Sequence, residues 1–187
     1  MRNVVQLITG SKSDIERELV KGCTRNSRIA QRDLYYKYCD AMFTIAYRIV
    51  NNRDDAHDAL QDAFIQVFRD IGQYRFDSTL GAWIKTIVVR TSLRLLSKNR
   101  NLSFADMDEA QSGEMILIPD TLNSEYLEKV ILSLPDGYRT VFLLTEVEGY
   151  THEEAANILG ISTGTSKSQL HHAKKMLKNR LSAIMDD

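Results

Sequence analysis

The sequence predicts an all-α protein built as two small helical domains joined by a flexible linker. Helix breakers are scarce, because the 187 residues include only 9 glycines and 2 prolines, and these residues disfavour a helix most. Apolar residues recur at helical spacing over most of the chain. One acidic stretch interrupts that periodicity. Together these observations predict domains over residues 1–100 and 125–187, with a linker over residues 101–124.

The overall composition is typical of a soluble globular chain, and its net charge does not indicate any class of binding partner. Hydrophobic residues make up 43% and charged residues 26%, and the formal net charge is -1. Near the start of the chain, polar and charged residues interrupt any signal-like apolar core. No stretch approaches the roughly 18 apolar residues that a membrane helix requires. We therefore expect a cytoplasmic protein without membrane insertion.

No metal, cofactor or enzymatic site is predicted. Cys23 and Cys39 have neither CxxC spacing nor a histidine at ligand spacing, and such thiols fit a reducing compartment. The sequence shows no P-loop and no catalytic arrangement of carboxylates. The best local acid–base cluster is His57 with Asp54 and Asp58, and the ordinary polarity of a helix surface explains it.

Two apolar stripes predict the first two helices of the N-terminal domain. Both repeat at i, i+1, i+4 and i+5, which places their members on one helix face. The members are Ala41, Met42, Ile45, Ala46, Ile49 and Val50, then Ala59, Leu60, Ala63, Phe64, Val67, Phe68 and Ile71. Residues 50–55 lie between the stripes and supply Asn and Asp side chains for a turn and an N-cap. The second helix carries an acidic face formed by Asp54, Asp55, Asp58 and Asp62 with Gln61.

A third helix, expected from about Ala82 to Lys98, is basic. Its stripe comprises Trp83, Thr86, Arg90, Arg94 and Ser97, with Lys85, Lys98 and Arg100 around it. A loop with Tyr74, Arg75 and Phe76 precedes the helix. Basic side chains interleaved with aromatic rings suit a nucleic acid whose nucleobases are unpaired, because an unpaired nucleobase stacks on an aromatic ring. The alternative is that Trp83, Tyr74 and Phe76 belong to the core of the domain, and for Trp83 the two environments are equally good.

The stretch from residue 101 to residue 128 is acidic. It contains no Lys or Arg, and its seven acids are Asp106, Asp108, Glu109, Glu114, Asp120, Glu125 and Glu128. Residues 104–120 show no sustained helical period, so we interpret this stretch as a linker with little fixed structure. Its charge predicts a segment that stays off DNA and passes through a basic channel of a partner.

The C-terminal domain is predicted to contain a helix-turn-helix. Thr151 suits an N-cap, and Gly160 suits the left-handed residue that ends the same helix. Ala156, four residues before this glycine, is small enough for close approach of a second helix, which is expected from about Thr165. This spacing is typical of the motif whose second helix enters the DNA major groove.

The face of this second helix opposite its apolar stripe is basic. Leu170, Ala173 and Leu177 form the apolar stripe. The opposite face holds Gly164, Ser168, His171 and Lys175, flanked by Lys167 and His172, and Lys174, Lys178 and Arg180 add charge. This pattern favours phosphate and base contacts over the alternative of an ordinary solvated face. Neighbouring histidines diverge on a helix, which argues against a shared metal ion.

The sequence motifs described above resemble those of a known protein family. Residues 53–96 (RDDAHDALQDAFIQVFRDIGQYRFDSTLGAWIKTIVVRTSLRLL) resemble region 2 of bacterial RNA polymerase sigma factors of the extracytoplasmic-function group, within the sigma-70 family. Residues 134–181 resemble region 4, and residues 14–49 resemble the start of region 2. The resemblance implies a specificity subunit without catalysis of its own, which binds core RNA polymerase and directs it to promoter DNA. It also implies an anti-sigma factor as a partner, because many members of the group are held inactive by one.

The resemblance also assigns residues to three surfaces. The first binds core polymerase at its β′ clamp helices, and comprises Asp55, Asp58, Gln61, Asp62 and Phe64. The second recognises and opens the −10 element, and comprises Tyr74, Arg75, Phe76, Trp83, Lys85, Thr86, Arg90, Arg94, Ser97 and Lys98. The third reads the −35 element, and comprises Thr165, Lys167, Ser168, Gln169, His171, His172, Lys174 and Lys175. The β flap of polymerase is a further expected partner.

The chain departs from the family pattern at several positions. Leu80 replaces a common aromatic residue, and Arg90 and Arg94 replace common Asn or Asp residues, which makes the −10 helix more basic. Ser166 replaces Val or Ile, so we expect weaker packing or a hydrogen bond to the preceding turn. Gln169 replaces a common Arg. The alternative function is a transcriptional regulator that binds duplex DNA without polymerase and uses its N-terminal half for sensing or dimerisation.

Overall fold

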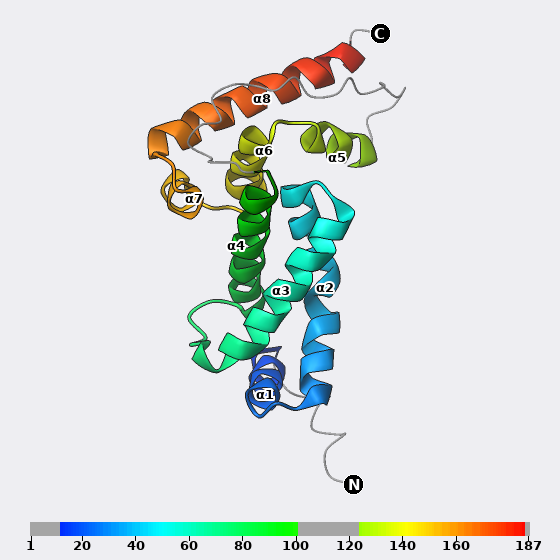
Figure 1. Ribbon diagram of the computed structural model, residues 1–187, viewed down its shortest axis with the longest axis vertical. Helices are drawn as coiled ribbons and strands as arrows, with labels where there is room; N and C mark the ends of the chain where they lie inside the picture. Colours follow the sequence, from blue (N-terminus) through cyan, green and yellow to red (C-terminus); the bar gives the residue numbers. More distant parts are fainter. Residues whose placement is uncertain (1–11, 101–123, 186–187) are drawn as a thin grey trace. The chain divides into compact units, whose positions relative to one another are not determined.

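The computed structural model describes residues 12–100 and 124–185, and every regular element within these two ranges is helical (Figure 1). The first range contains α1 (Lys12–Thr24), α2 (Arg28–Val50), α3 (Arg53–Asp70), the 3-10 turn η2 (Ile71–Gln73) and α4 (Leu80–Arg100). The second contains α5 (Ser124–Leu132), α6 (Asp136–Phe142), the π-helical turn η4 (Leu143–Val147), α7 (His152–Leu159) and α8 (Thr163–Met185). The all-α prediction is confirmed.

The described residues form two compact units. The first holds residues up to 92 apart from 48–51, and the second holds residues 48–51 together with those from 93 onward. The expected linker, residues 101–124, lies outside the described residues except for its last position, where α5 begins. The boundaries at 100 and 125 therefore stay predictions.

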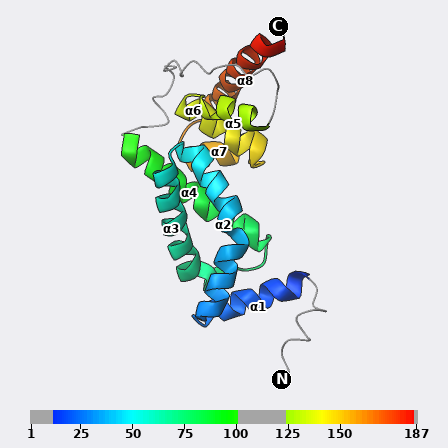
Figure 2. The ribbon, with the colours of Figure 1, turned by 90° about the vertical axis from the view of Figure 1, so that its right-hand side faces the viewer.

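The first unit is built around α2, α3 and α4, which lie side by side in both views (Figures 1 and 2). Asn52 caps α3, because its side chain accepts hydrogen bonds from the backbone N–H groups of Asp54 and Asp55 at 2.9 and 3.0 Å. The predicted stripes supply the core apart from Ala41, which is exposed, and α4 contributes to it from its first residue. The completely buried side chains include Leu34, Ala46, Ala56, Ala63, Val67, Leu80, Ile84, Val88 and Val89.

Helix α1 packs on this unit through a close backbone approach. A Cβ atom at Gly22 would lie 2.6 Å from the Cβ of Ala30, so only glycine fits there. Glu16 of α1 accepts hydrogen bonds from Lys37 and Tyr38 of α2 at 3.3 and 3.2 Å. Cys23 is buried in the same contact, and burial raises the pKa of its thiol, as expected for an inert cysteine.

The second unit contains α5 to α8. Its core cluster consists of Tyr126, Val130, Leu134, Tyr138, Ala173 and Leu177. Arg139 lies inside with 1% of its surface exposed, and it donates hydrogen bonds to the Asp136 carboxylate at 2.5 Å and the Leu134 carbonyl at 2.9 Å. A buried guanidinium is tolerated only when it is paired in this way.

The predicted helix-turn-helix is present as α7 and α8. Thr151 caps α7 with a capping box: its hydroxyl accepts from the Glu154 N–H, and the Glu154 carboxylate accepts from the Thr151 N–H. Gly160 ends the helix in the left-handed region at φ 67°. Helix α8 begins at Thr163, two residues before the predicted start, because the Ser162 hydroxyl accepts a hydrogen bond from the Thr165 N–H at 2.9 Å.

Candidate nucleic-acid and protein interfaces

In the acidic face of α3, Asp58, Gln61 and Asp62 lie beside Ile65. All four side chains are exposed, and their spacing of three and four residues places them on one side of the helix. Ile65 is 58% exposed, so an apolar group lies beside two carboxylates. Asp55, one turn earlier, is half-buried. Such a face can bind a basic partner that also offers an apolar contact.

Phe64 belongs to the core and not to this face. Its side chain is 3% exposed, and its ring contacts Tyr35 at 4.8 Å and Phe68 at 5.9 Å between centroids. The expectation that Phe64 binds a partner is therefore corrected. The exposed neighbour Ile65 was not predicted, although an apolar residue outside the apolar stripe of an amphipathic helix is the signal that could have identified it.

The loop before α4 contains one exposed aromatic ring, and the buried ring of Tyr74 supports it from inside. Tyr74 is 8% exposed, and its hydroxyl donates to the Ser78 carbonyl at 2.6 Å. Its ring lies 5.5 Å from Trp83 and 4.6 Å from Phe76 between centroids. Burial raises the pKa of the Tyr74 hydroxyl. Tyr74 therefore fixes the loop from inside, and we correct the expectation that its ring is freely available for stacking.

Phe76 is the exposed ring of this loop. It is 43% exposed and adopts φ 62°, a left-handed conformation that is unusual for a bulky residue. Local strain of this kind is often found at binding sites. Arg75 beside it is also exposed. Trp83 is half-buried, so its exposure lies between the two predicted environments, the core and a DNA-binding surface.

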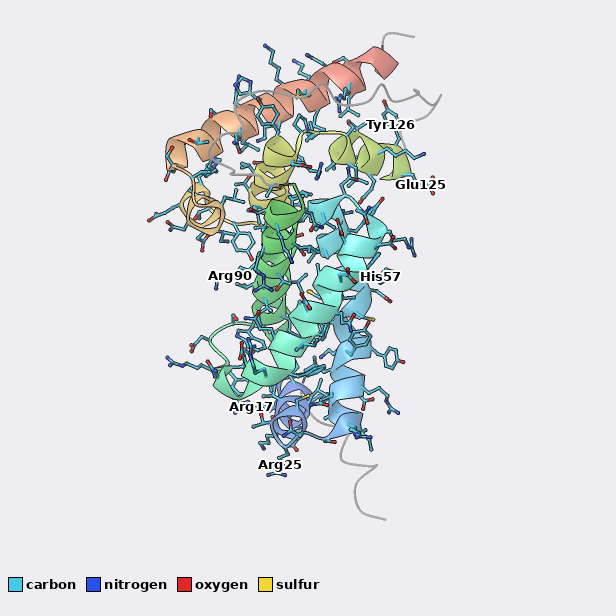
Figure 3. The ribbon with its side chains drawn as sticks, viewed as in Figure 1. Arg17, Arg25, His57, Arg90, Glu125 and Tyr126 are labelled. Atoms are coloured by element: carbon cyan, nitrogen blue, oxygen red, sulfur yellow. The ribbon has the colours of Figure 1, made fainter. Side chains whose placement is uncertain are left out.

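Helix α4 carries a basic edge formed by Arg90, Arg94 and Lys98. These exposed cations are spaced four residues apart and follow one side of the helix, with Arg90 shown in Figure 3. The other predicted members of this surface, namely Lys85, Thr86 and Ser97, are half-buried. The Thr86 hydroxyl donates to the Ala82 carbonyl at 3.1 Å. The basic edge therefore offers most of the positive charge on α4.

Most predicted residues of α8 are exposed. Thr165 is half-buried, and the exposed members are Lys167, Ser168, His171, His172, Lys174 and Lys175. The His172 ring stacks on Tyr138, with 5.6 Å between the centroids, and Lys174 pairs with Glu146 at 2.9 Å. Lys175 lies directly opposite the buried stripe.

Gln169 is a further correction, because it is 1% exposed and does not lie on the exposed face with the other predicted residues of α8. Ser166, three residues earlier, is fully buried on the same side of α8. Its hydroxyl lies 2.9 Å from Nδ1 of His152, so the expected hydrogen bond reaches the first residue of α7 rather than the preceding turn. Both positions extend the apolar stripe of Leu170, Ala173 and Leu177 towards the start of α8.

Within residues 12–100 and 124–185, no group of three or more His, Cys, Asp or Glu side chains is arranged to hold a metal ion. In the same part of the chain, no helix has the length and apolar character needed to cross a bilayer.

Comparison with known families matches both helical regions. Residues 34–102 match the family described as Sigma-70 region 2, and residues 124–177 match the family described as Sigma-70, region 4. The first match includes α3 and α4, and the second includes the helix-turn-helix.

Several curated proteins are similar over most of the chain. The ECF RNA polymerase sigma factor SigE of Mycolicibacterium smegmatis is 28% identical over 80% of this chain and 60% of its own length. The RNA polymerase sigma-H factor of Pseudomonas aeruginosa is 25% identical, covering 91% and 95%. The ECF RNA polymerase sigma-E factor of Haemophilus influenzae is 26% identical, covering 91% and 97%.

Two solved structures share the fold. The sigma factor RpoE from Bartonella quintana, crystallised with the anti-sigma factor NepR, has a TM-score of 0.55 and 23% identity, with 81% of this chain and 96% of that chain covered. CnrH, solved with the cytosolic domain of CnrY, has a TM-score of 0.53 and 20% identity, with 89% and 97% covered. With regions 2 and 4 both matched in order, the chain belongs to the sigma-70 family of RNA polymerase sigma factors, in its extracytoplasmic-function group.

Proposed function

We propose that this chain binds core RNA polymerase and directs it to promoters through separate −10 and −35 contacts. The observation that carries the proposal is the presence of an acidic face on α3 and of two basic surfaces, on α4 and α8, in the regions that match the family. A protein that only bound duplex DNA would need neither the acidic face nor the exposed ring of Phe76.

In this proposal the acidic face docks on the β′ clamp helices of polymerase. Asp58 and Asp62 supply charge complementarity, which steers association and orients the partner. Ile65 replaces Phe64 as the apolar contact, because only Ile65 is exposed. The β flap is the expected partner of the C-terminal region.

The loop and α4 would recognise and open the −10 element. Losing the stacking of a duplex costs about 1.4 kcal/mol per base-pair step. Stacking a freed base on an aromatic ring returns about 1–3 kcal/mol, so Phe76 with partial help from Trp83 can offset a large part of local opening. No nucleotide hydrolysis is needed. Arg90, Arg94 and Lys98 would hold the phosphates.

Helix α8 would read the −35 element from the major groove. Lys167, Ser168, His171 and Lys175 are exposed on the side away from the core. Side chains in the early turns of a recognition helix reach the edges of DNA bases, while Lys and Arg side chains in later turns bind phosphates. An anti-sigma protein is part of the same proposal, since the similar RpoE was crystallised with one.

Run-off transcription with purified bacterial core polymerase and a genomic promoter library tests this function. We expect start sites that depend on this protein and disappear in the double variant Asp58→Lys, Asp62→Lys. The variant Asp40→Lys, which reverses an exposed acid on α2, should retain them. If the chain does not bind core polymerase but binds specific duplex sequences alone, the transcriptional-regulator alternative is correct.

A further inference from the structure

A row of aromatic rings connects the core of the second unit to the exposed side of α8. Tyr138 of α6 belongs to the core cluster and is 6% exposed. The His172 ring is stacked on the Tyr138 ring, with 5.6 Å between the centroids and 20° between the planes. The His171 ring meets the His172 ring edge to face, at 5.8 Å and 75°. The row therefore begins at a buried side chain and ends at an exposed one.

Both ring contacts have a geometry that aromatic side chains prefer. Stacked and edge-to-face pairs are attractive at centroid separations of about 4.5–7 Å, and both separations fall in this range. Because neighbouring residues on a helix point about 100° apart, His171 and His172 leave α8 in different directions. His172 contacts α6, and His171 contacts α6 only through the His172 ring. Tyr138 can therefore influence His171 without touching it.

This arrangement restricts the His171 side chain before DNA arrives. An exposed side chain on a helix samples several rotamers, and binding must select one of them at a cost in conformational entropy. The His172 ring occupies the space on one side of His171, and Tyr138 holds the His172 ring there. Part of the ordering that binding requires is thus already present in the folded chain, which favours affinity and a defined direction for the imidazole.

We propose that Tyr138 is a positioning residue for −35 recognition, which acts on the His171 side chain through the ring of His172. The ligand of His171 is a base edge in the major groove, where an imidazole nitrogen can donate or accept a hydrogen bond. His172 is then a link between the core and the groove. The inference rests on the proposed function of α8, and it adds a buried residue of α6 to the determinants of promoter specificity.

Three substitutions separate this role from a contribution to packing alone. Tyr138→Leu removes the ring and keeps an apolar side chain in the core. Tyr138→Phe keeps the ring and removes only the hydroxyl, so it should restore the stack. Tyr126→Leu is the matched control, because Tyr126 of α5 is a tyrosine of the same core cluster and is 4% exposed. Circular dichroism and the thermal midpoint establish that each variant is folded.

The test is a double-mutant cycle on the DNA specificity of the reconstituted holoenzyme. The measured quantity is the ratio of affinities for the −35 sequence found by run-off transcription and for variants changed at single base pairs. We expect Tyr138→Leu to lower this ratio about three- to tenfold at the base pair where His171→Ala lowers it. The double variant should lose no more than His171→Ala alone, because both changes act on one contact. Tyr138→Phe and Tyr126→Leu should keep the wild-type ratio.

A second measurement follows the row of rings without polymerase or DNA. Nuclear magnetic resonance of the full chain with isotope-labelled histidine reports the chemical shifts of the imidazole protons. In Tyr138→Leu the signals of His172 and His171 should both move, because the ring of Tyr138 no longer lies against the first and the first no longer holds the second. Tyr138→Phe and Tyr126→Leu should leave both signals close to their wild-type positions.

The outcomes distinguish this inference from the proposed function. Unchanged His171 signals in Tyr138→Leu, additive losses in the cycle, or an equal loss in Tyr126→Leu would each overturn the inference while the wild-type holoenzyme still selects a −35 sequence. If instead the wild-type chain does not bind core polymerase, or its holoenzyme prefers no −35 sequence, the proposed function is contradicted and the role of Tyr138 in recognition falls with it, whatever the imidazole signals show.

Discussion

The hydroxyl of Ser166 lies 2.9 Å from Nδ1 of His152, and this contact joins the start of the recognition helix to the start of the helix before it. Both residues occupy first turns, of α8 and α7 respectively. Ser166 is fully buried and His152 is half-buried. A hydrogen bond at this point fixes the angle between the two helices where a Val or Ile would supply only packing.

Removing this hydrogen bond should destabilise the second unit. We expect Ser166→Ala and His152→Ala each to lower the free energy of unfolding by about 1 kcal/mol. The double variant should lose less than the sum, because both single changes break the same bond. Denaturant unfolding of the four proteins measures the coupling, with Ser168→Ala as the exposed control. Additive losses would show that the contact contributes no coupling energy.

Phe64 and Ile65 should separate stability from binding. Phe64→Ala should lower the free energy of unfolding by about 3–5 kcal/mol, because it empties a core position. Ile65→Ala should change stability by less than about 0.5 kcal/mol and yet weaken binding to core polymerase, since its side chain is exposed on the acidic face. Thermal unfolding and a core-binding titration give the two quantities. Unchanged core binding in Ile65→Ala would remove this residue from the interface.

Lys174 and Lys175 are neighbours that should respond differently to salt. Lys174 pairs with Glu146, whereas Lys175 lies opposite the buried stripe. We expect Lys175→Gln to reduce the slope of log affinity against log salt by about 1, the value for one lost phosphate contact. Lys174→Gln should reduce it less. The slopes are measured with reconstituted holoenzyme on promoter DNA, and a larger change for Lys174 would mean that the groove meets a different side of α8.

The capping box makes the stability of the helix-turn-helix depend on pH. Hydrogen bonds from the Thr151 N–H and hydroxyl lower the pKa of Glu154 below its ordinary value of 4.5. A lowered folded-state pKa contributes stability that is present above the ordinary value and is lost as the pH falls through the folded-state value. The thermal midpoint of Glu154→Gln should therefore be lower than that of wild type near neutral pH, and the two midpoints should converge in acid.

Thermal midpoints measured from neutral pH down to below pH 4.5 test this convergence. Glu153→Gln changes the neighbouring exposed acid, which is outside the capping box, and serves as the control. A constant difference between wild type and Glu154→Gln over the whole range would show that protonation of this carboxylate does not affect folding.

Features set by local chemistry were predictable from the sequence. Thr151 caps α7 as expected, and Gly160 adopts the left-handed conformation that its position demands. The cap expected from the Asn and Asp residues at 50–55 is supplied by Asn52. Each depends on a short stretch of chain, where side-chain type decides the hydrogen bond. The start of α8 was misplaced because Ser162, not a later residue, provides its cap.

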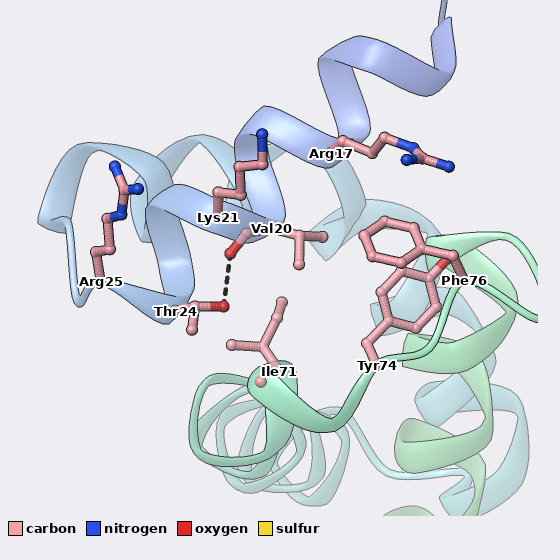
Figure 4. Close-up of a pocket in the computed structure, with 9 residues that line it drawn as sticks. Arg17, Val20, Lys21, Thr24, Arg25, Ile71, Tyr74 and Phe76 are labelled. Carbon is pink, nitrogen blue, oxygen red and sulfur yellow. Dashed lines mark hydrogen bonds between the residues drawn. The ribbon is translucent and has the colours of Figure 1, made fainter.

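Features that depend on packing were harder to predict from the sequence. Phe64 and Gln169 were assigned to binding surfaces by resemblance, although the helical periodicity of this chain places both on buried faces. That periodicity was the better guide at these two positions. A pocket of about 330 Å³ beside Phe76 (Figure 4) could not be predicted, because it depends on how α1 lies against η2, and no local pattern encodes a contact between segments so far apart in sequence.

The close contact at Gly22 determines how freely the charges on α1 can vary. Since not even a methyl group fits between Gly22 and Ala30, this contact sets the spacing of α1 and α2 at that point, beside the hydrogen bonds that Glu16 accepts from Lys37 and Tyr38. Lys21, whose side chain is more than 60% exposed, can thus be exchanged with little effect on this contact. The charge on the outer side of α1 is therefore open to evolution or design at little risk to folding, provided that the glycine is kept.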